Sequence, residues 1–137
     1  MTNYALGFSN LHNYSRFPAI TVPIVLIADV NTSIDLQAKV DTGSTYCIFE
    51  KRHADWLDLD LTSGTLMRME TPTGSFYRYG HELIVSVFDM EWQAVVYFAE
   101  HEAFRTSVVG RTGFLDHLKV GIVDYEQLLY LGLYDEA

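Results

Sequence analysis

Residues 34–44 have the sequence IDLQAKVDTGS, and this stretch constrains the fold more than any other part of the chain. Apolar and polar side chains alternate from Ile34 to Val40, which is the period of a β-strand with one buried face. The strand leads directly into Asp41, and Gly43 permits a tight turn two residues later. The stretch therefore predicts a carboxylate held on a turn at the end of an amphipathic strand.

Signals for short strands dominate the rest of the chain. An alternation from Ile20 to Leu26 predicts a partner for the first strand, because turn-forming residues 29–33 lie between the two. Pro23 lacks the N–H that a ladder needs, so this partner strand is expected at an edge or after a break. Further strands are predicted at residues 65–70, 76–79, 83–88, 92–98, 108–109, 120–122 and 128–131.

Two short helices are expected among these strands. Residues 50–57 have helix-compatible side chains and predict about two turns of helix. Thr112 is expected to cap a short helix that ends at Leu118. Many short strands, few helices and no long polar linker predict an all-β, closed or sandwich-like fold, with residues 1–137 forming one domain.

Charge and hydropathy exclude several classes of partner. The formal net charge of −9 disfavours nucleic acids, whose binding depends on Lys and Arg that neutralise phosphates. No apolar run approaches the roughly 18 residues that span a bilayer, and the N-terminus lacks a basic start followed by an apolar stretch. We therefore expect neither nucleic acid nor membrane as a partner and assign the chain to the cytoplasm.

The single cysteine and the five histidines carry no recognisable reactive pattern. Cys47 cannot form an internal disulfide, which favours a reducing compartment, and it is expected to pack as an apolar residue rather than act as a nucleophile. The histidines are scattered, and neither His81 nor His101 has a second histidine four residues later. We expect no metal site and no cofactor.

Asp41, Thr42 and Gly43 are the residues that point to chemistry. A given tripeptide occurs by chance in a chain of this length with a probability on the order of a few per cent, so a plain turn or cap is the alternative role. Other features decide between the two. In chain order they are the strand that ends at Asp41, Cys47–Phe49 leading to a helix near Ala54, a hairpin around Gly74, and Val108–Arg111 before a second short helix.

With these four features in this order, the sequence resembles the retropepsin-like aspartic proteases over residues 20–131. The resemblance implies a two-fold homodimer, since only one Asp-Thr-Gly occurs here and each chain would donate one Asp41. The two carboxylates would share a water and a proton, as is known for such dyads, so that one is charged and one protonated. The implied activity is hydrolysis of peptide or protein substrates without a cofactor.

The resemblance also implies supporting roles. Thr42, Gly43 and Ser44 would support the active loop, which is the turn that follows the strand and carries Asp41. The Thr42 hydroxyl would form a hydrogen bond across the dimer. Thr71, Pro72, Thr73, Gly74 and Ser75 would form a flap over bound peptide. Val108, Val109 and Gly110 would pack beside and under the loop, and Arg111 would make a structural ion pair. The terminal segments 4–8 and 128–131 are expected at the dimer interface.

Two departures and two alternatives remain. Thr112, Gly113 and Phe114 follow the arginine where the retroviral pattern differs, and the hairpin tip has Pro72 and Thr73 in place of a run of glycines. One alternative is a weak or inactive protease-like domain that binds peptides or serves assembly. The other is an unrelated β-barrel binder with a coincidental tripeptide. The intact Asp-Thr-Gly favours an active enzyme.

Overall fold

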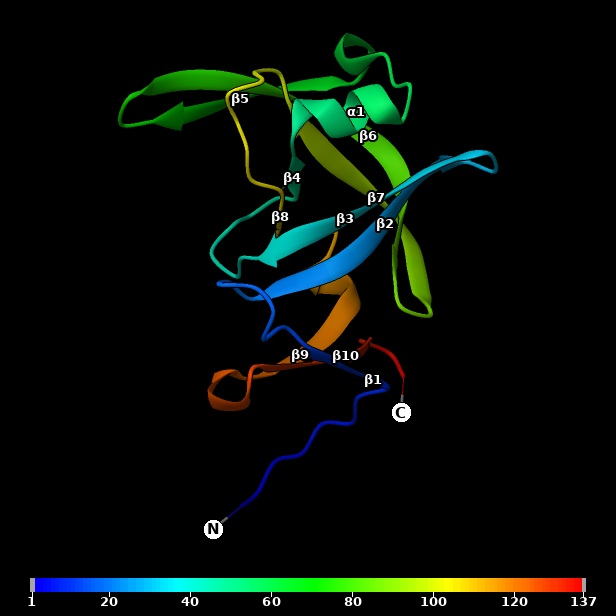
Figure 1. Ribbon diagram of the computed structural model, residues 1–137, viewed down its shortest axis with the longest axis vertical. Coiled ribbons are helices and arrows are strands. Elements are labelled where there is room, and N and C mark those ends of the chain that lie inside the picture. Colours follow the sequence, from blue (N-terminus) through cyan, green and yellow to red (C-terminus); the bar gives the residue numbers. More distant parts are fainter. Residues whose placement is uncertain (1, 137) are drawn as a thin grey trace.

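Two β-sheets make up most of the structure, a computed structural model that describes residues 2–136 (Figure 1). The larger sheet has the strand order β2-β3-β8-β4-β7-β6-β5, and an additional pairing of β2 with β6 closes it on itself. This confirms the predicted all-β, closed architecture. Its strands are β2 (Thr21–Asp29), β3 (Thr32–Val40), β4 (Ile48–Phe49), β5 (Thr65–Thr71), β6 (Gly74–Val87), β7 (Met90–Ala99) and β8 (Val108–Val109).

The first hairpin, β2–β3, forms as predicted, with buried and more exposed residues alternating along β2. Val22, Ile24 and Leu26 of β2 are buried, and the intervening residues are more exposed. Pro23 pairs with Gln37 of β3, whereas β6 contacts β2 only between Val25 and Ile27. The proline therefore lies in a part of β2 with a single neighbouring strand, where its missing N–H does not interrupt a second ladder.

β6 joins the closed sheet to a projecting hairpin. Its first half pairs with β5 as far as Gly80, and from Arg78 onward it pairs with β7. The sequence predicted two strands here, at 76–79 and 83–88, and this was wrong. The strand continues through Gly80 because the Tyr97 ring packs where a side chain would be, so the glycine marks a close contact and not a break. β5 and the first part of β6 extend together away from the body (Figure 1).

The core lies inside the closed sheet and continues under one helix. Phe49 of β4 packs on Phe98 of β7 with ring centroids 5.9 Å apart, and both side chains are fully buried. Helix α1 (Lys51–Trp56) follows β4 directly and buries Ala54 against the sheet, while Leu57, just after it, is also buried. This confirms the helix predicted at 50–57. A 3-10 turn, η1 (Leu61–Ser63), leads from the helix region to β5.

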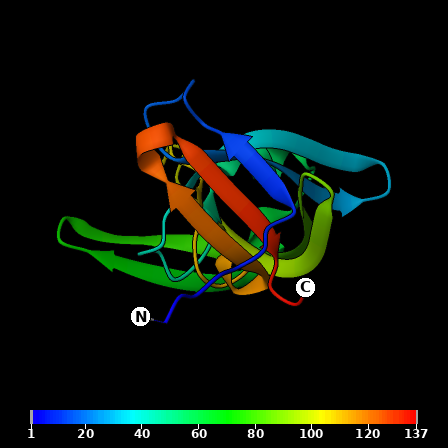
Figure 2. The same cartoon turned by 90° about the horizontal axis from the view of Figure 1, so that it is seen from below.

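A second sheet of three strands carries both ends of the chain (Figure 2). It consists of β1 (Asn10–Asn13), β9 (Leu118–Val123) and β10 (Leu128–Leu133), with the 3-10 turn η3 (Asp124–Glu126) between the last two. β10 is the central strand and pairs antiparallel with both β1 and β9. Leu129 and Leu131 are fully buried and join the main core.

A single chain leaves the interface role expected for segment 128–131 as a prediction, and it rules out one form of that role. Both edges of β10 are occupied within the chain, so it cannot accept a strand from another chain; the edges that remain open belong to β1 and β9. The segment 4–8 forms no strand before β1, and the Tyr4 side chain is 93% exposed. Among residues 2–136, no helix is long and apolar enough to cross a membrane.

Candidate active site

Asp41 follows the last residue of β3, at the start of the loop that leads to β4. The short strand β8 lies between these two strands, parallel to β3 and antiparallel to β4. The backbone N–H of Asp41 donates to the Val109 carbonyl at 3.0 Å, which extends the β3–β8 ladder by one residue. The main chain of Asp41 is thus fixed by the sheet while its half-buried side chain lies on the loop.

The loop orients the carboxylate through its own backbone. Gly43 N–H donates to Asp41 Oδ1 at 3.0 Å, and Ser44 N–H donates to the Asp41 carbonyl at 3.1 Å. Ser44 Oγ donates to the Tyr46 carbonyl at 2.7 Å and so closes the far side of the loop. Thr42 and Gly43 are exposed at its tip. A hydrogen bond from a backbone N–H to a carboxylate limits rotation of the side chain.

Residues 110–112 support the loop from beneath. Arg111 N–H donates to the Ser44 carbonyl and Thr112 N–H to the Thr45 carbonyl, both at 2.8 Å. Gly110 lies so close to the loop that an added Cβ would be 2.6 Å from the Tyr46 carbonyl oxygen and closer still to that of Ser44. Only a residue without a side chain leaves the loop in place.

We therefore expect Gly110→Ala to displace the active loop. The Cβ meets two backbone oxygens that cannot rotate away, so the free energy of unfolding should fall by about 1–3 kcal/mol, the usual cost of overpacking. Gly132→Ala is the matched control, because its Cβ would meet the Glu136 side chain at 3.4 Å and the Phe8 backbone at 3.5 Å, which are ordinary van der Waals contacts. Denaturant melts of both variants test this, and equal stabilities would contradict a tight contact under the loop.

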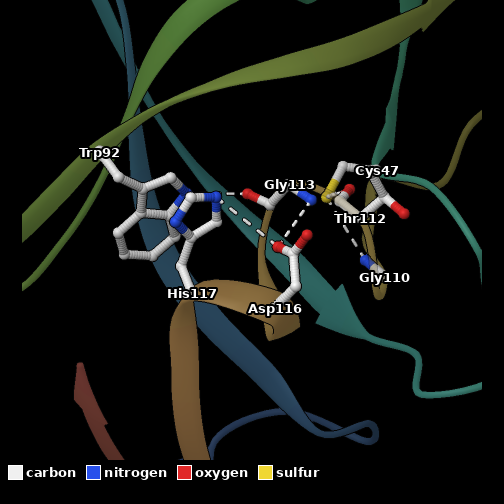
Figure 3. Close-up of polar contacts among 7 residues, drawn as sticks. All are labelled: Cys47, Trp92, Gly110, Thr112, Gly113, Asp116 and His117. Atoms are coloured by element: carbon white, nitrogen blue, oxygen red, sulfur yellow. Dashed lines mark hydrogen bonds and ion pairs between the residues drawn. The ribbon is translucent and has the colours of Figure 1, made fainter. Parts of the chain in front are cut away.

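Residues 110–112 are themselves held in place by polar contacts of the segment that follows them, around Gly113 (Figure 3). Trp92 Nε1 donates to the Gly113 carbonyl at 2.8 Å, and Gly113 N–H donates to Asp116 Oδ1 at 3.0 Å. The His117 ring stacks on Trp92 at 5.1 Å with an interplanar angle of 11°. The expected helix from Thr112 to Leu118 is only a 3-10 turn, η2 (Leu115–His117). Thr112 does not cap it, because its backbone pairs with residues 45 and 46 instead.

Cys47 belongs to the same support. Its buried Sγ accepts from Gly110 N–H at 3.4 Å and donates to the Thr112 carbonyl at 3.5 Å (Figure 3). Burial raises the pKa of the Cys47 thiol to about 12, and the partial compensation by the Gly110 N–H does not offset this. The thiol stays protonated at neutral pH and is a poor nucleophile, so its part here is packing.

Arg111 differs from the expected ion-paired arginine. Its side chain is exposed and belongs to none of the ion pairs formed within residues 2–136. It lines a surface hollow of about 550 Å³ that begins at Thr42, at the tip of the active loop. Within one chain, Arg111 acts on the loop through its backbone N–H alone.

Comparisons with known proteins give one consistent result. No family model matches the sequence, and no curated protein matches it. A retropepsin-like aspartic protease from Rickettsia conorii is similar in structure, with a TM-score of 0.68 and 20% identity over 92% of this chain and 99% of that chain. EIAV protease complexed with the inhibitor HBY-793 is similar with a TM-score of 0.50 and 18% identity over 73% and 86%. The chain has the retropepsin-like fold.

In this retropepsin-like fold, the β5–β6 hairpin carries the residues expected to form the flap. Residues 71–75 span its tip, where Gly74 has a φ of 139° that other residues rarely adopt. Thr71 Oγ1 donates to the Gly74 carbonyl at 2.7 Å and tightens the turn. Further down the hairpin, Met69 and Arg78 face the active loop across a hollow of about 260 Å³ whose other walls are residues 43–46.

Arg78 is the residue of this site that the sequence did not single out. It is a buried residue of β6 whose guanidinium packs against two tyrosine rings that also contact each other. The alternation of β6 carried a weak signal, since Arg78 has the same parity as the half-buried Phe76 and the buried Gly80. Within residues 2–136, no group of three or more His, Cys, Asp or Glu side chains is placed to hold a metal ion.

Proposed function

We propose that the chain is a homodimeric aspartic endopeptidase in which two copies of Asp41 activate one water. The observation that carries the proposal is the half-exposed Asp41 carboxylate, oriented by Gly43 N–H at the end of β3 in a retropepsin-like fold. One chain supplies one such carboxylate, and a symmetric pair of chains supplies the second. The alternative is a module that binds peptides without cleaving them. It predicts the same fold, so only an assay of peptide cleavage distinguishes it from the enzyme.

The reaction needs one charged and one protonated carboxylate. Two like charges a few ångströms apart are costly, so the pair keeps one proton. The charged Asp41 takes a proton from the water as the water oxygen attacks the scissile carbonyl carbon. The protonated Asp41 donates its proton to the developing oxyanion, which gives a tetrahedral diol. The Asp41 that took the water's proton passes it to the leaving nitrogen as the C–N bond breaks, and the other Asp41 takes a proton from a diol hydroxyl as the product carboxyl forms. The two carboxylates then share one proton again.

The second copy is expected to approach the tip of the loop. Thr42 is exposed there, and Arg111 lines the adjacent hollow without an ion pair to any of residues 2–136. These side chains offer hydroxyl and guanidinium donors to a partner. The chain carries a net charge of −9, so two copies repel each other over long range, and this repulsion weakens as salt rises. Association should therefore be favoured by salt and by acid.

A peptide library incubated at several pH values, with mass spectrometry of the products, tests the proposed activity. We expect new internal cleavages, and the specific activity should fall when the protein is diluted and rise with salt at a fixed low protein concentration. Sedimentation under the same conditions gives the dimer fraction. Cleavage by a species that sediments as a monomer would contradict the shared site, and binding without cleavage would favour the module.

A further inference from the structure

Arg78 is a buried cation in the wall of the proposed substrate cleft. Its side chain is 4% exposed, and it is the buried member of the Lys and Arg residues within 2–136. The guanidinium carbon lies 5.1 Å from the ring centroid of Tyr46 and 5.3 Å from that of Tyr97. Desolvation lowers the pKa of Arg78, and the two tyrosines oppose this shift. The two rings contact each other at 5.2 Å, and their attraction for the cation favours this position of the guanidinium.

The N–H donors of Arg78 have weak partners. One terminal nitrogen contacts Met67 Sδ at 3.0 Å, and the other contacts Met69 Sδ at 3.9 Å. Nε is buried with no hydrogen-bond partner among the described residues, and none of their ion pairs includes Arg78. Thioether sulfur is a poor acceptor, whereas a carboxylate accepts two parallel N–H bonds from a guanidinium. The geometry suits an acidic ligand better than the two methionines.

The hollow beside Arg78 is walled by the loop that follows Asp41. It has a volume of about 260 Å³ and is lined by Gly43, Ser44, Thr45, Tyr46, Met69 and Arg78. Gly43 is also the residue whose N–H holds Asp41 Oδ1. The volume is below the roughly 300–1,000 Å³ of pockets that hold whole small molecules, so it suits a single side chain. A side chain close to the scissile bond would enter it.

We propose that Arg78 makes the enzyme selective for peptides with an Asp or Glu side chain adjacent to the cleaved bond. The carboxylate enters the hollow and bonds the guanidinium, while the flexible thioethers of Met67 and Met69 move aside. This inference rests on the proposed endopeptidase function. A symmetric dimer brings two copies of Arg78, so the acidic side chain can be read on either side of the bond.

Matched peptide pairs test the selectivity. Each pair differs only by Glu or Gln at a position flanking the bond, and kcat/KM is measured for both. Wild type should prefer Glu by at least about tenfold, since a hydrogen bond to a charged group contributes roughly 1.5–3 kcal/mol. Arg78→Met should bring the ratio to about one, and Arg78→Lys should give an intermediate ratio because it keeps the charge but loses the paired donors.

Controls keep the test decisive. Arg78→Met should fold, because replacing a buried charge by an apolar side chain is often neutral or stabilising, and thermal melts check this. Arg68→Gln removes the same charge from the outer face of the same hairpin, where Arg68 pairs with Glu70 at 3.0 Å, and should keep the Glu preference. If Arg78→Met fails to fold, the test rests on the Glu/Gln ratio of kcat/KM for wild type and for Arg78→Lys. A wild-type ratio near one, or an unchanged ratio in Arg78→Lys, then overturns the inference.

The outcomes separate this inference from the proposed function. Cleavage by wild type without a Glu preference, or a preference that Arg78→Met retains, overturns the inference and leaves the endopeptidase intact. Absence of cleavage at every pH overturns the proposed function. In that case, calorimetry measures the binding of the same Glu and Gln peptides to wild type and to Arg78→Met. A preference for Glu that the variant loses supports carboxylate recognition, and equal binding of the two peptides to wild type overturns it.

Discussion

Asp41→Asn should abolish peptide cleavage while the fold remains. An amide has nearly the shape of a carboxylate and can still accept the Gly43 N–H bond, but it cannot take a proton from water at neutral pH. Loss of general acid–base catalysis alone should lower kcat at least about 10²–10⁴-fold. Product formation by mass spectrometry, with circular dichroism of the same sample, gives both readouts. Cleavage that survives in the folded variant would eliminate the aspartic protease mechanism.

The same variant tests whether two carboxylates meet. At neutral pH the wild-type dimer brings together two acidic groups that repel each other, and the amides of Asp41→Asn do not. The variant dimer should therefore melt at a higher temperature than wild type near pH 7. The gap should shrink toward about pH 4, where protonation relieves the repulsion in the wild type. Paired melting curves measure this gap, and a gap that does not change with pH would contradict the shared proton.

The features that sequence predicts well are those set by local pattern. The alternation from Ile34 to Val40 places β3 and the turn at Asp41 because burial of one face fixes the register. Helix α1 follows from the same argument with a different period. The hairpin around Gly74 is found because its turn residues are distinctive. None of these depends on knowing which distant segment lies alongside.

The features that sequence missed are those set by distant neighbours. Gly80 looks like a break within β6 until Tyr97 of the adjacent strand is known to fill the space. The strand at 128–131 is predicted from the sequence, but its two neighbours, β1 and β9, are not. Arg78 looks like a surface residue, since arginine is mostly exposed, until Tyr46 and Tyr97 are found packed against it. Each of these three features depends on contacts between residues far apart in the sequence, and the local pattern of side chains does not reveal such contacts.

The contribution of a second chain can be measured by mixing. Wild type and Asp41→Asn, re-equilibrated in equal amounts at a fixed total concentration near pH 4, where the stability gap should have closed, should associate at random if the variant keeps the interface. About one quarter of the dimers then hold two Asp41 side chains, and about one half hold only one. If both are required, the mixture should retain about one quarter of the activity of wild type alone at the same total concentration.

The control for mixing is a variant that folds and associates without touching the loop. Val30→Ala changes a side chain that is 97% exposed in the turn between β2 and β3, and a mixture of this variant with wild type should keep full activity. Excess Asp41→Asn should inhibit further, because nearly every wild-type chain is then paired with an inactive one. A mixture that retains about one half of the wild-type activity would mean that each chain works alone, which contradicts an active site built from one Asp41 of each copy.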